Sequence, residues 1–189
     1  MRVLLGSKSP RRKELLSMLE ISFEVVSIDC DENFPEDIPH IHVAEYLSEK
    51  KSNAYKALPD SDLLITADTM VLVDNSLLVK PVNKEESLQM LDLISDMTHQ
   101  VITGVTMRTN SKKISFSSTT DVTFNAIDSN DRKFYADNFP VMDKAGGYGI
   151  QDWIGLSHVK LIKGCYYNVM GLPTSMLYKR LKYDFGHEI

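Results

Sequence analysis

The chain has 189 residues, of which 43% are hydrophobic and 25% charged, and this composition indicates a folded protein rather than a disordered one. Its formal net charge of -5 argues against general nucleic-acid binding, which depends on many lysines and arginines. No apolar run reaches the length of a membrane span, and Met1-Arg2 leads into an apolar strand without a signal-peptide pattern. We therefore expect a cytoplasmic protein that binds neither nucleic acid nor membrane. Cys30 and Cys165 are expected to stay reduced, as small buried side chains.

The first segment predicts a strand and then a helix whose start attracts an anion. Val3 to Leu5 is typical of a buried strand, Ser9 of an N-cap and Pro10 of a first helical residue. Arg11 and Arg12 then fall in the first turn. Cations there oppose the helix dipole, at roughly 0.3–1 kcal/mol each. A phosphate would relieve that repulsion and satisfy the free amide donors of the turn, and a solvated basic turn is the alternative.

The next elements alternate between strand and helix. Phe23 to Ile28 predicts a strand, Asp29 to His40 a loop, and Val43 to Leu58 a second helix. Lys50 and Lys51 flank the apolar stripe of this helix on opposite sides, about 100° apart. The two lysines are therefore not expected to point into one narrow site.

A long apolar run, Leu63 to Val73, is interrupted by Asp68 and its neighbour Thr69. A carboxylate in such a strand is costly to bury unless it meets a cation, a metal or several donors. Asp68 is therefore the strongest single candidate for chemistry, and a strand-end aspartate that faces water is the alternative. The acidic loop around Glu32 offers oxygen ligands to a hard divalent cation, with a solvated run of charges as the other interpretation.

Turn and capping signals organise the rest of the chain. Asp74-Asn75 predicts a hairpin turn, and Asn83 with Glu86 forms the capping-box pattern of a third helix. Later segments predict strands at 101–107, 114–116, 122–124 and 161–162, a short helix at 131–137, and a last helix after Pro173. Strands and helices interleave without strict βαβ regularity, which favours an α/β fold with a mixed sheet.

Two further lysines lie beside residues that restrict or free the backbone. Lys80 lies between a predicted strand and Pro81, a rigid placement that suits an ammonium aimed at one spot, although a plain surface lysine is the alternative. Lys144 precedes the glycine-rich segment 145–149, where backbone amides can approach a ligand or form a tight structural turn. His99 precedes a strand and is expected to be a hydrogen-bonded framework residue.

Six motifs are spread over nearly the whole chain. They are Ser7 to Leu16, Ala67 to Thr69, Lys80-Pro81, His99 to Val105, Asp143 to Gln151 and Asn168 to Pro173. Together, and in this order, they resemble the Maf family, which is named for a link to bacterial septum formation. Members of the family are nucleoside triphosphate pyrophosphatases. The segment Lys144 to Gln151 is similar to that of the subgroup acting on dTTP and UTP.

The resemblance implies a fold and an activity. The implied fold is α/β, with an elongated mixed β-sheet flanked by helices and two lobes around a central cleft. It implies a single Maf-like domain over residues 1–189, commonly as a homodimer. The implied reaction is water attack at the α-phosphate of dTTP or UTP, assisted by Mg²⁺ or Mn²⁺, which yields the monophosphate and pyrophosphate. This hydrolysis would remove non-standard or excess nucleotides.

The resemblance also implies roles for single residues. Asp68 matches the family's proton acceptor and, with Glu32, would hold the metal. The other matched positions would contact the substrate: Arg11, Arg12, Lys50, Thr69, Lys80, Lys144 and Gln151. Gln151 presents an amide donor and acceptor that suit the edge of uracil or thymine. The match selects Lys50 over Lys51, so that the Lys51 ammonium is expected to extend into solvent.

Some positions depart from the family pattern. Thr66 and Val79 stand where glycine usually precedes the Asp68 and Lys80 motifs, and Asp152 stands where glycine commonly follows Gln151. The added bulk of Thr66 and Val79, beside Asp68 and Lys80, affects pocket dimensions and therefore substrate breadth. Two other functions use the same basic residues: a nucleotide-binding regulator of cell division without turnover, and a phosphatase that releases the terminal phosphate.

Overall fold

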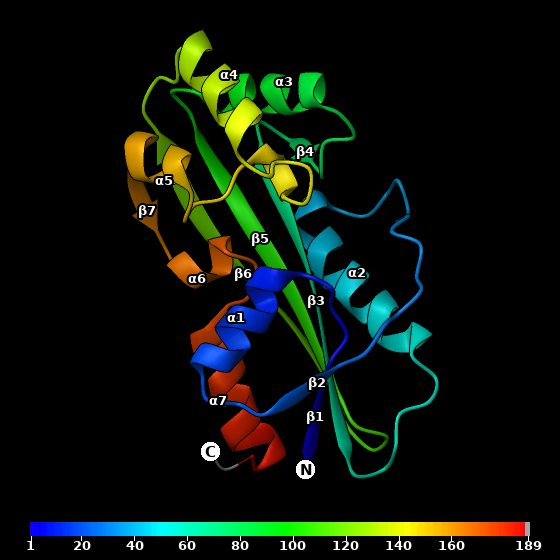
Figure 1. Ribbon diagram of the computed structural model, residues 1–189. Coiled ribbons are helices and arrows are strands. Elements are labelled where there is room, and N and C mark those ends of the chain that lie inside the picture. Colours follow the sequence, from blue (N-terminus) through cyan, green and yellow to red (C-terminus); the bar gives the residue numbers. More distant parts are fainter. Residues whose placement is uncertain (188–189) are drawn as a thin grey trace. The chain divides into compact units, whose positions relative to one another are not determined.

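The computed structural model describes residues 1–187 and has a mixed α/β fold (Figure 1). The strands are β1 (Arg2–Leu5), β2 (Phe23–Val25), β3 (Asp62–Val73), β4 (Ser76–Leu78), β5 (Thr98–Arg108), β6 (Lys113–Phe124) and β7 (Val159–Lys163). The helices are α1 (Pro10–Met18), α2 (His40–Ala54), α3 (Lys84–Ile94), α4 (Ser129–Asn138), α5 (Trp153–His158), α6 (Tyr166–Val169) and α7 (Thr174–Phe185), with a 3₁₀ turn, η1 (Ala145–Gly147). None of the helices in this part of the chain is both long and apolar enough to span a membrane.

The strands within these residues form one mixed sheet in the order β2-β1-β3-β5-β6-β7, with β4 paired to β3. β1 runs parallel to β2 and β3, whereas β4 is antiparallel to β3 and β7 to β6. The predicted α/β class with a mixed sheet is confirmed. The chain divides into two compact units. Unit 1 comprises Met1–Asp68, Thr103–Ser118 and the chain from Gly171, and unit 2 comprises Thr69–Ile102 and Thr119–Met170.

The core of unit 1 forms where β1 and α2 meet the first half of β3. Val3 and Leu5 of β1 are buried, and β1 pairs in register with residues 62–65 of β3. α2 packs very closely on β5, because a Cβ on Gly104 would lie 2.3 Å from the Ala44 backbone. Only glycine at residue 104 lets the helix come this close to the strand, because any larger residue would push α2 away from β5.

Unit 2 is organised by capped helices and an aromatic cluster. The Asn83 side chain accepts the Glu86 amide at 2.8 Å, which confirms the predicted cap of α3. Asp128 caps α4 by accepting from the amides of residues 130 and 131. α3 and α4 lie next to each other (Figure 1). His99 donates to or accepts from the Tyr148 hydroxyl at 2.7 Å, so its predicted framework role is confirmed.

Several predicted boundaries are wrong. α2 ends at Ala54 and not at Leu58, because Leu58 packs with Leu4 and Leu64 in a separate apolar cluster. β2 ends at residue 25, and the two strands expected over 114–124 are one continuous strand, β6. The short elements η1, α5 and α6 were not predicted, since helices of one or two turns carry little periodic signal. Both cysteines are free, as expected, but half-buried rather than buried.

Candidate active site

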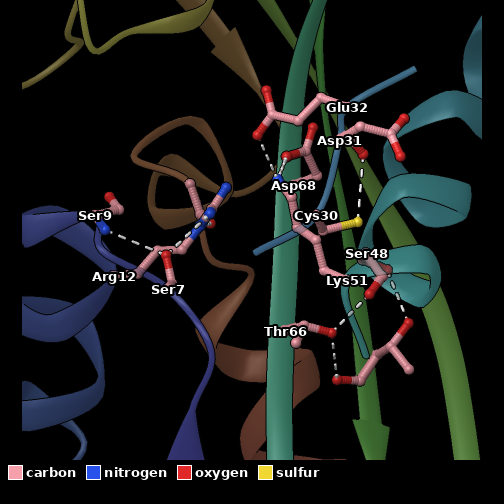
Figure 2. A network of polar contacts seen from close by, with 12 residues as sticks. Ser7, Ser9, Arg12, Cys30, Asp31, Glu32, Ser48, Lys51, Thr66 and Asp68 are labelled. Carbon is pink, nitrogen blue, oxygen red and sulfur yellow. Dashed lines mark hydrogen bonds and ion pairs between the residues drawn. The ribbon is translucent and has the colours of Figure 1, made fainter. Parts of the chain in front are cut away.

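Asp68 of β3 lies at the centre of a charged cluster in unit 1. Asp68 is only 5% exposed, and its carboxylate accepts a hydrogen bond from the Lys51 ammonium. The same ammonium donates to Glu32 Oε1 at 2.9 Å, so that one cation bridges two carboxylates (Figure 2). Burial of Asp68 is compensated by a cation, which is one of the conditions expected from the sequence.

Strand and helix periodicity explain why Lys51 reaches Asp68. Thr66 and Asp68 are two residues apart on β3 and therefore point to the same face. Ser48 and Lys51 are three residues apart on α2 and share one side of the helix. The Thr66 hydroxyl donates to the Ser48 carbonyl at 2.7 Å. One step further along both α2 and β3, the Lys51 ammonium meets the Asp68 carboxylate in the same way. Figure 2 shows the two pairs along β3.

Arg12 supplies a second cation to this cluster. Its Nε donates to the Gly171 carbonyl at 2.8 Å, and its guanidinium also donates to the Ser7 hydroxyl at 3.3 Å. Burial lowers the pKa of Arg12 and the neighbouring charge of Arg11 lowers it further, whereas Asp68 and Glu32 raise it. The guanidinium is therefore held near the two carboxylates by fixed hydrogen bonds. Arg11 lies half-buried in the same first turn of α1.

The expected orientation of Lys51 is wrong. The Lys51 side chain is 15% exposed and points to the carboxylates rather than to solvent. Lys50 instead donates to Asp31 Oδ1 at 2.5 Å and to the Asn33 carbonyl at 2.8 Å, in the loop before α2. The predicted substrate contact of Lys50 stays a prediction, but the geometry adds Lys51 to the candidate residues.

A family model with the description Maf-like protein matches residues 2–183 of this chain. The chain belongs to the Maf family. It is 46% identical over 184 residues to a protein of Parabacteroides distasonis named dTTP/UTP pyrophosphatase, covering 96% of this chain and 95% of that one. Proteins of the same name from Bacteroides thetaiotaomicron (95% of this chain, 94% of that one) and Porphyromonas gingivalis (98% and 94%) are 43% and 44% identical. Among solved structures, a HAM1 protein from Coxiella burnetii matches 66% of this chain and 73% of its own, at 10% identity and a TM-score of 0.41.

In this Maf-family chain the two carboxylates fit a divalent cation. Asp68 and Glu32 already share one cation, the Lys51 ammonium, so their oxygens converge on one point. Hard divalent cations prefer carboxylate oxygens and complete their shell with water and phosphate. No cluster of three or more His, Cys, Asp or Glu suited to a metal exists among residues 1–187. Asp68 and Glu32 are the two residues that would hold the ion, and their role as metal ligands stays a prediction.

The candidate residues of unit 2 differ in how they are held. Lys144 is 4% exposed, and its ammonium donates to the Pro140 carbonyl and lies 3.3 Å from Asp143 Oδ1 and 3.4 Å from Asp152 Oδ2. This arrangement favours a structural role, and the predicted substrate contact of Lys144 stays a prediction. Lys80 is exposed, two residues after the end of β4.

The glycine segment before Gln151 is both a tight turn and a support for the strand end. Gly146 and Gly147 have positive φ angles of 70° and 71°, which favour glycine. The Gly146 amide donates to the Val79 carbonyl at 3.1 Å, and so holds the residue before Lys80. The Gln151 side-chain oxygen is buried and accepts no hydrogen bond within the described chain. Thr69 follows Asp68 on β3 and is half-buried.

Proposed function

We propose that this chain hydrolyses dTTP and UTP to the nucleoside monophosphate and pyrophosphate. The names of relatives that are 43–46% identical over nearly the whole chain support this substrate class. The observation that carries the proposal is the cluster in unit 1, where a buried carboxylate lies with a second carboxylate and two cations. Water activation and neutralisation of phosphate charge need these groups together.

Asp68 has the environment of a general base. Its carboxylate is buried on β3 and lies next to the Lys51 ammonium. In the proposed reaction Asp68 orients the attacking water and accepts its proton. A Mg²⁺ or Mn²⁺ ion held by Asp68 and Glu32 would neutralise phosphate charge and polarise the α-phosphorus.

The cations of unit 1 are proposed to hold the triphosphate. Lys51 would exchange its carboxylate partners for phosphate oxygens, since a lysine ammonium has three donors that rotate freely. Arg11 and Arg12 in the first turn of α1 would bind phosphate at the positive end of the helix dipole. Lys50 remains a candidate at the rim, because its ammonium is held by the loop at Asp31.

Residues of unit 2 are proposed to read the base and to extend the substrate contacts. Gln151 combines a buried, unpaired side-chain oxygen with an amide donor, the pair needed by the O4 and N3-H edge of a pyrimidine. Thr69, Lys80 and Lys144 complete the proposed substrate contacts. We also propose that residues 1–189 act as one domain, as a cytoplasmic homodimer that removes non-standard or excess nucleotides.

Product analysis tests the proposal and separates it from the two alternatives. The purified protein with Mg²⁺ or Mn²⁺ is incubated with dTTP, UTP, CTP and GTP, and the products are resolved by anion-exchange chromatography. We expect monophosphate and pyrophosphate from dTTP and UTP. After chelation of the metal we expect no hydrolysis of either nucleotide. Nucleoside diphosphate with orthophosphate would instead identify a terminal phosphatase. Tight binding of UTP without any product would identify a regulator.

A further inference from the structure

Gln151 lies inside a tight turn whose ends are Gly149 and Asp152. The Asp152 amide donates to the Gly149 carbonyl at 3.0 Å, so that Ile150 and Gln151 occupy the two central positions. α5 packs directly against this turn, because a Cβ on Gly155 would lie 1.9 Å from the Ile150 carbonyl oxygen. The turn is therefore fixed in shape by its backbone contacts.

One buried hydroxyl joins the two ends of the turn. Tyr135 of α4 is fully buried, and its hydroxyl oxygen accepts the Gly149 amide at 2.9 Å. Because that amide can only donate, the hydroxyl hydrogen is left to donate to Asp152 Oδ2, at 2.8 Å. A single side chain thus connects the residue at the start of the turn with the residue at its end.

Charge compensation allows Asp152 to take part in this contact. The Lys144 ammonium lies 3.4 Å from the same Asp152 oxygen, and that side chain is only 17% exposed. The packing is close, since a Cβ on Gly149 would lie 2.6 Å from Asp152 Oδ2 and 2.8 Å from Lys144 Cε. A glycine at residue 149 is therefore needed for the hydroxyl, the carboxylate and the ammonium to meet.

α4 also contacts the residue that follows the turn. The ring of Phe134 lies 4.9 Å from the ring of Trp153 in an edge-on arrangement. Phe134 directly precedes Tyr135 on α4. Trp153 is the only tryptophan of the chain. Its fluorescence therefore reports on the end of the turn next to Asp152.

We propose that Tyr135 is a positioning residue for base selection, which with Asp152 and Lys144 holds the turn so that the Gln151 amide keeps one orientation. The inference rests on the proposed function and deepens it. The Gln151 side-chain oxygen has no partner within residues 1–187, so the protein orients this amide through the backbone of the turn. Loss of the hydroxyl frees both ends of the turn at once, because the Gly149 amide and the Asp152 carboxylate share it.

Kinetics of Tyr135→Phe test the role of the hydroxyl, with Tyr167→Phe as a matched control on the half-exposed helix α6. For Tyr135→Phe we expect the KM for UTP to rise roughly tenfold and the UTP-to-CTP ratio of kcat/KM to fall by a similar factor, the effect of a lost hydrogen bond to a charged group. The kcat for UTP should stay within about twofold, since the residue does not touch the reacting atoms. Tyr167→Phe should match the wild type. An equal fall of kcat for both nucleotides, with unchanged KM and ratio, would show a purely structural role and overturn the proposal.

Substitutions at Asp152 test the same contact from its other side. Asp152→Asn keeps an oxygen that accepts from Tyr135 and should retain most of the base preference. Asp152→Ala removes that oxygen, should reproduce the effect of Tyr135→Phe, and should add nothing to it in the double variant. Full additivity of the two changes would contradict a shared contact. If Tyr135→Phe does not fold by circular dichroism, Asp152→Ala carries the test.

Binding measured without turnover separates this inference from the proposed function. The non-hydrolysable analogues α,β-imido-UTP and α,β-imido-CTP are titrated with Mg²⁺ while Trp153 emission is recorded. We expect the wild type to prefer the UTP analogue and Tyr135→Phe to lose most of that preference. An unchanged ratio of the two Kd values in Tyr135→Phe overturns the positioning role. A wild type that prefers the UTP analogue but does not cleave UTP overturns the proposed function alone, and one without any preference overturns both.

Discussion

Two buried clusters, one around Asp68 in unit 1 and one around His99 in unit 2, hold polar groups in different ways. In unit 1, full charges lie together: the Lys51 ammonium bridges Asp68 and Glu32, with Arg12 nearby. Around His99 in unit 2, the buried groups are neutral. Burial lowers the pKa of His99 to about 4 and raises the pKa of Tyr148, and the two side chains share a hydrogen bond of 2.7 Å.

This difference separates exchangeable contacts from permanent ones. An ion pair can be replaced by another ion pair, so a triphosphate with its metal can take the places of the protein partners in unit 1. A neutral hydrogen bond between two buried, edge-on aromatic rings has no such substitute, and it fixes shape. Substitutions in the cluster around Asp68 should therefore change catalysis strongly at little cost in fold, and substitutions around His99 should change stability.

Asp68→Asn should give the largest effect on activity. The amide keeps the shape of the side chain but cannot accept a proton, so kcat is expected to fall by about 10²–10⁴-fold, the range for a lost general base. Asp62→Asn is the matched control, because Asp62 is also buried on β3 and paired with a cation, Arg2. Its kcat should stay within about twofold of wild type. Near wild-type kcat and an unchanged pH profile for Asp68→Asn would leave Asp68 as a structural residue.

The adjacent lysines of α2 offer the next test. Lys51→Ala removes the ammonium that contacts Asp68 and Glu32, and kcat/KM for UTP should fall on the order of 100-fold, the effect of losing strong bonds to charged groups. Lys50→Ala removes a contact to Asp31 and should change kcat/KM by less than about threefold, as for an exposed ion pair. Circular dichroism checks that both variants fold. A larger loss for Lys50→Ala would show that the loop contact of Lys50 gives way to substrate.

The lysine pair shows what sequence alone can give. A carboxylate within an apolar strand predicted correctly that Asp68 meets a compensating group, because burial of a charge requires compensation. The compensating lysine was missed because only apolar residues defined the buried side of α2. Ser48 and Ser52 are also fully buried there, and small polar residues hydrogen-bond inside helix interfaces. Counting them would have moved the buried stripe of the helix toward Lys51.

Contacts between residues far apart in the sequence also limit what the sequence can predict. The cap of α3 and the mixed sheet were predictable, because both follow from local spacing. The bond from Tyr135 to Asp152 joins residues 17 apart across a helix and an irregular turn, and no periodic pattern marks it. For the same reason the buried position of Lys144 was not visible beside its glycines.

Acid should destabilise the protein through His99. Its pKa is about 4 in the fold against 6.5 in the unfolded chain, so between these values the unfolded chain binds a proton that the folded chain does not. Stability is therefore lost as pH falls from about 7 toward 4, with a loss of about 2 kcal/mol, or roughly 30-fold in the folding equilibrium, by pH ~5. Urea unfolding at the two pH values measures it. His99→Gln should remove most of the difference, and His42→Gln, at an exposed position of α2, should keep it.

Equal pH dependence in wild type and His99→Gln would assign the acid sensitivity to other groups. The neutral cluster of unit 2 would then not be the permanent contact that distinguishes it from unit 1. Activity of His99→Gln at neutral pH should stay within about threefold of wild type, since a framework residue acts through stability.

Gln151→Ala should give the smallest effect and refine the comparison within unit 2. The variant removes the side-chain amide, whose oxygen has no hydrogen-bond partner within residues 1–187, without touching the backbone of its turn. The UTP-to-CTP ratio of kcat/KM should therefore fall roughly tenfold, the value of one or two hydrogen bonds. Gln100→Ala is the matched control, because the Gln100 amide already donates to Asp121 at 3.2 Å on the sheet. Its ratio should equal that of the wild type. If Gln151→Ala lowers kcat/KM for UTP, CTP and GTP by one common factor, the residue contributes to binding in general, and base selection must come from other side chains of the chain.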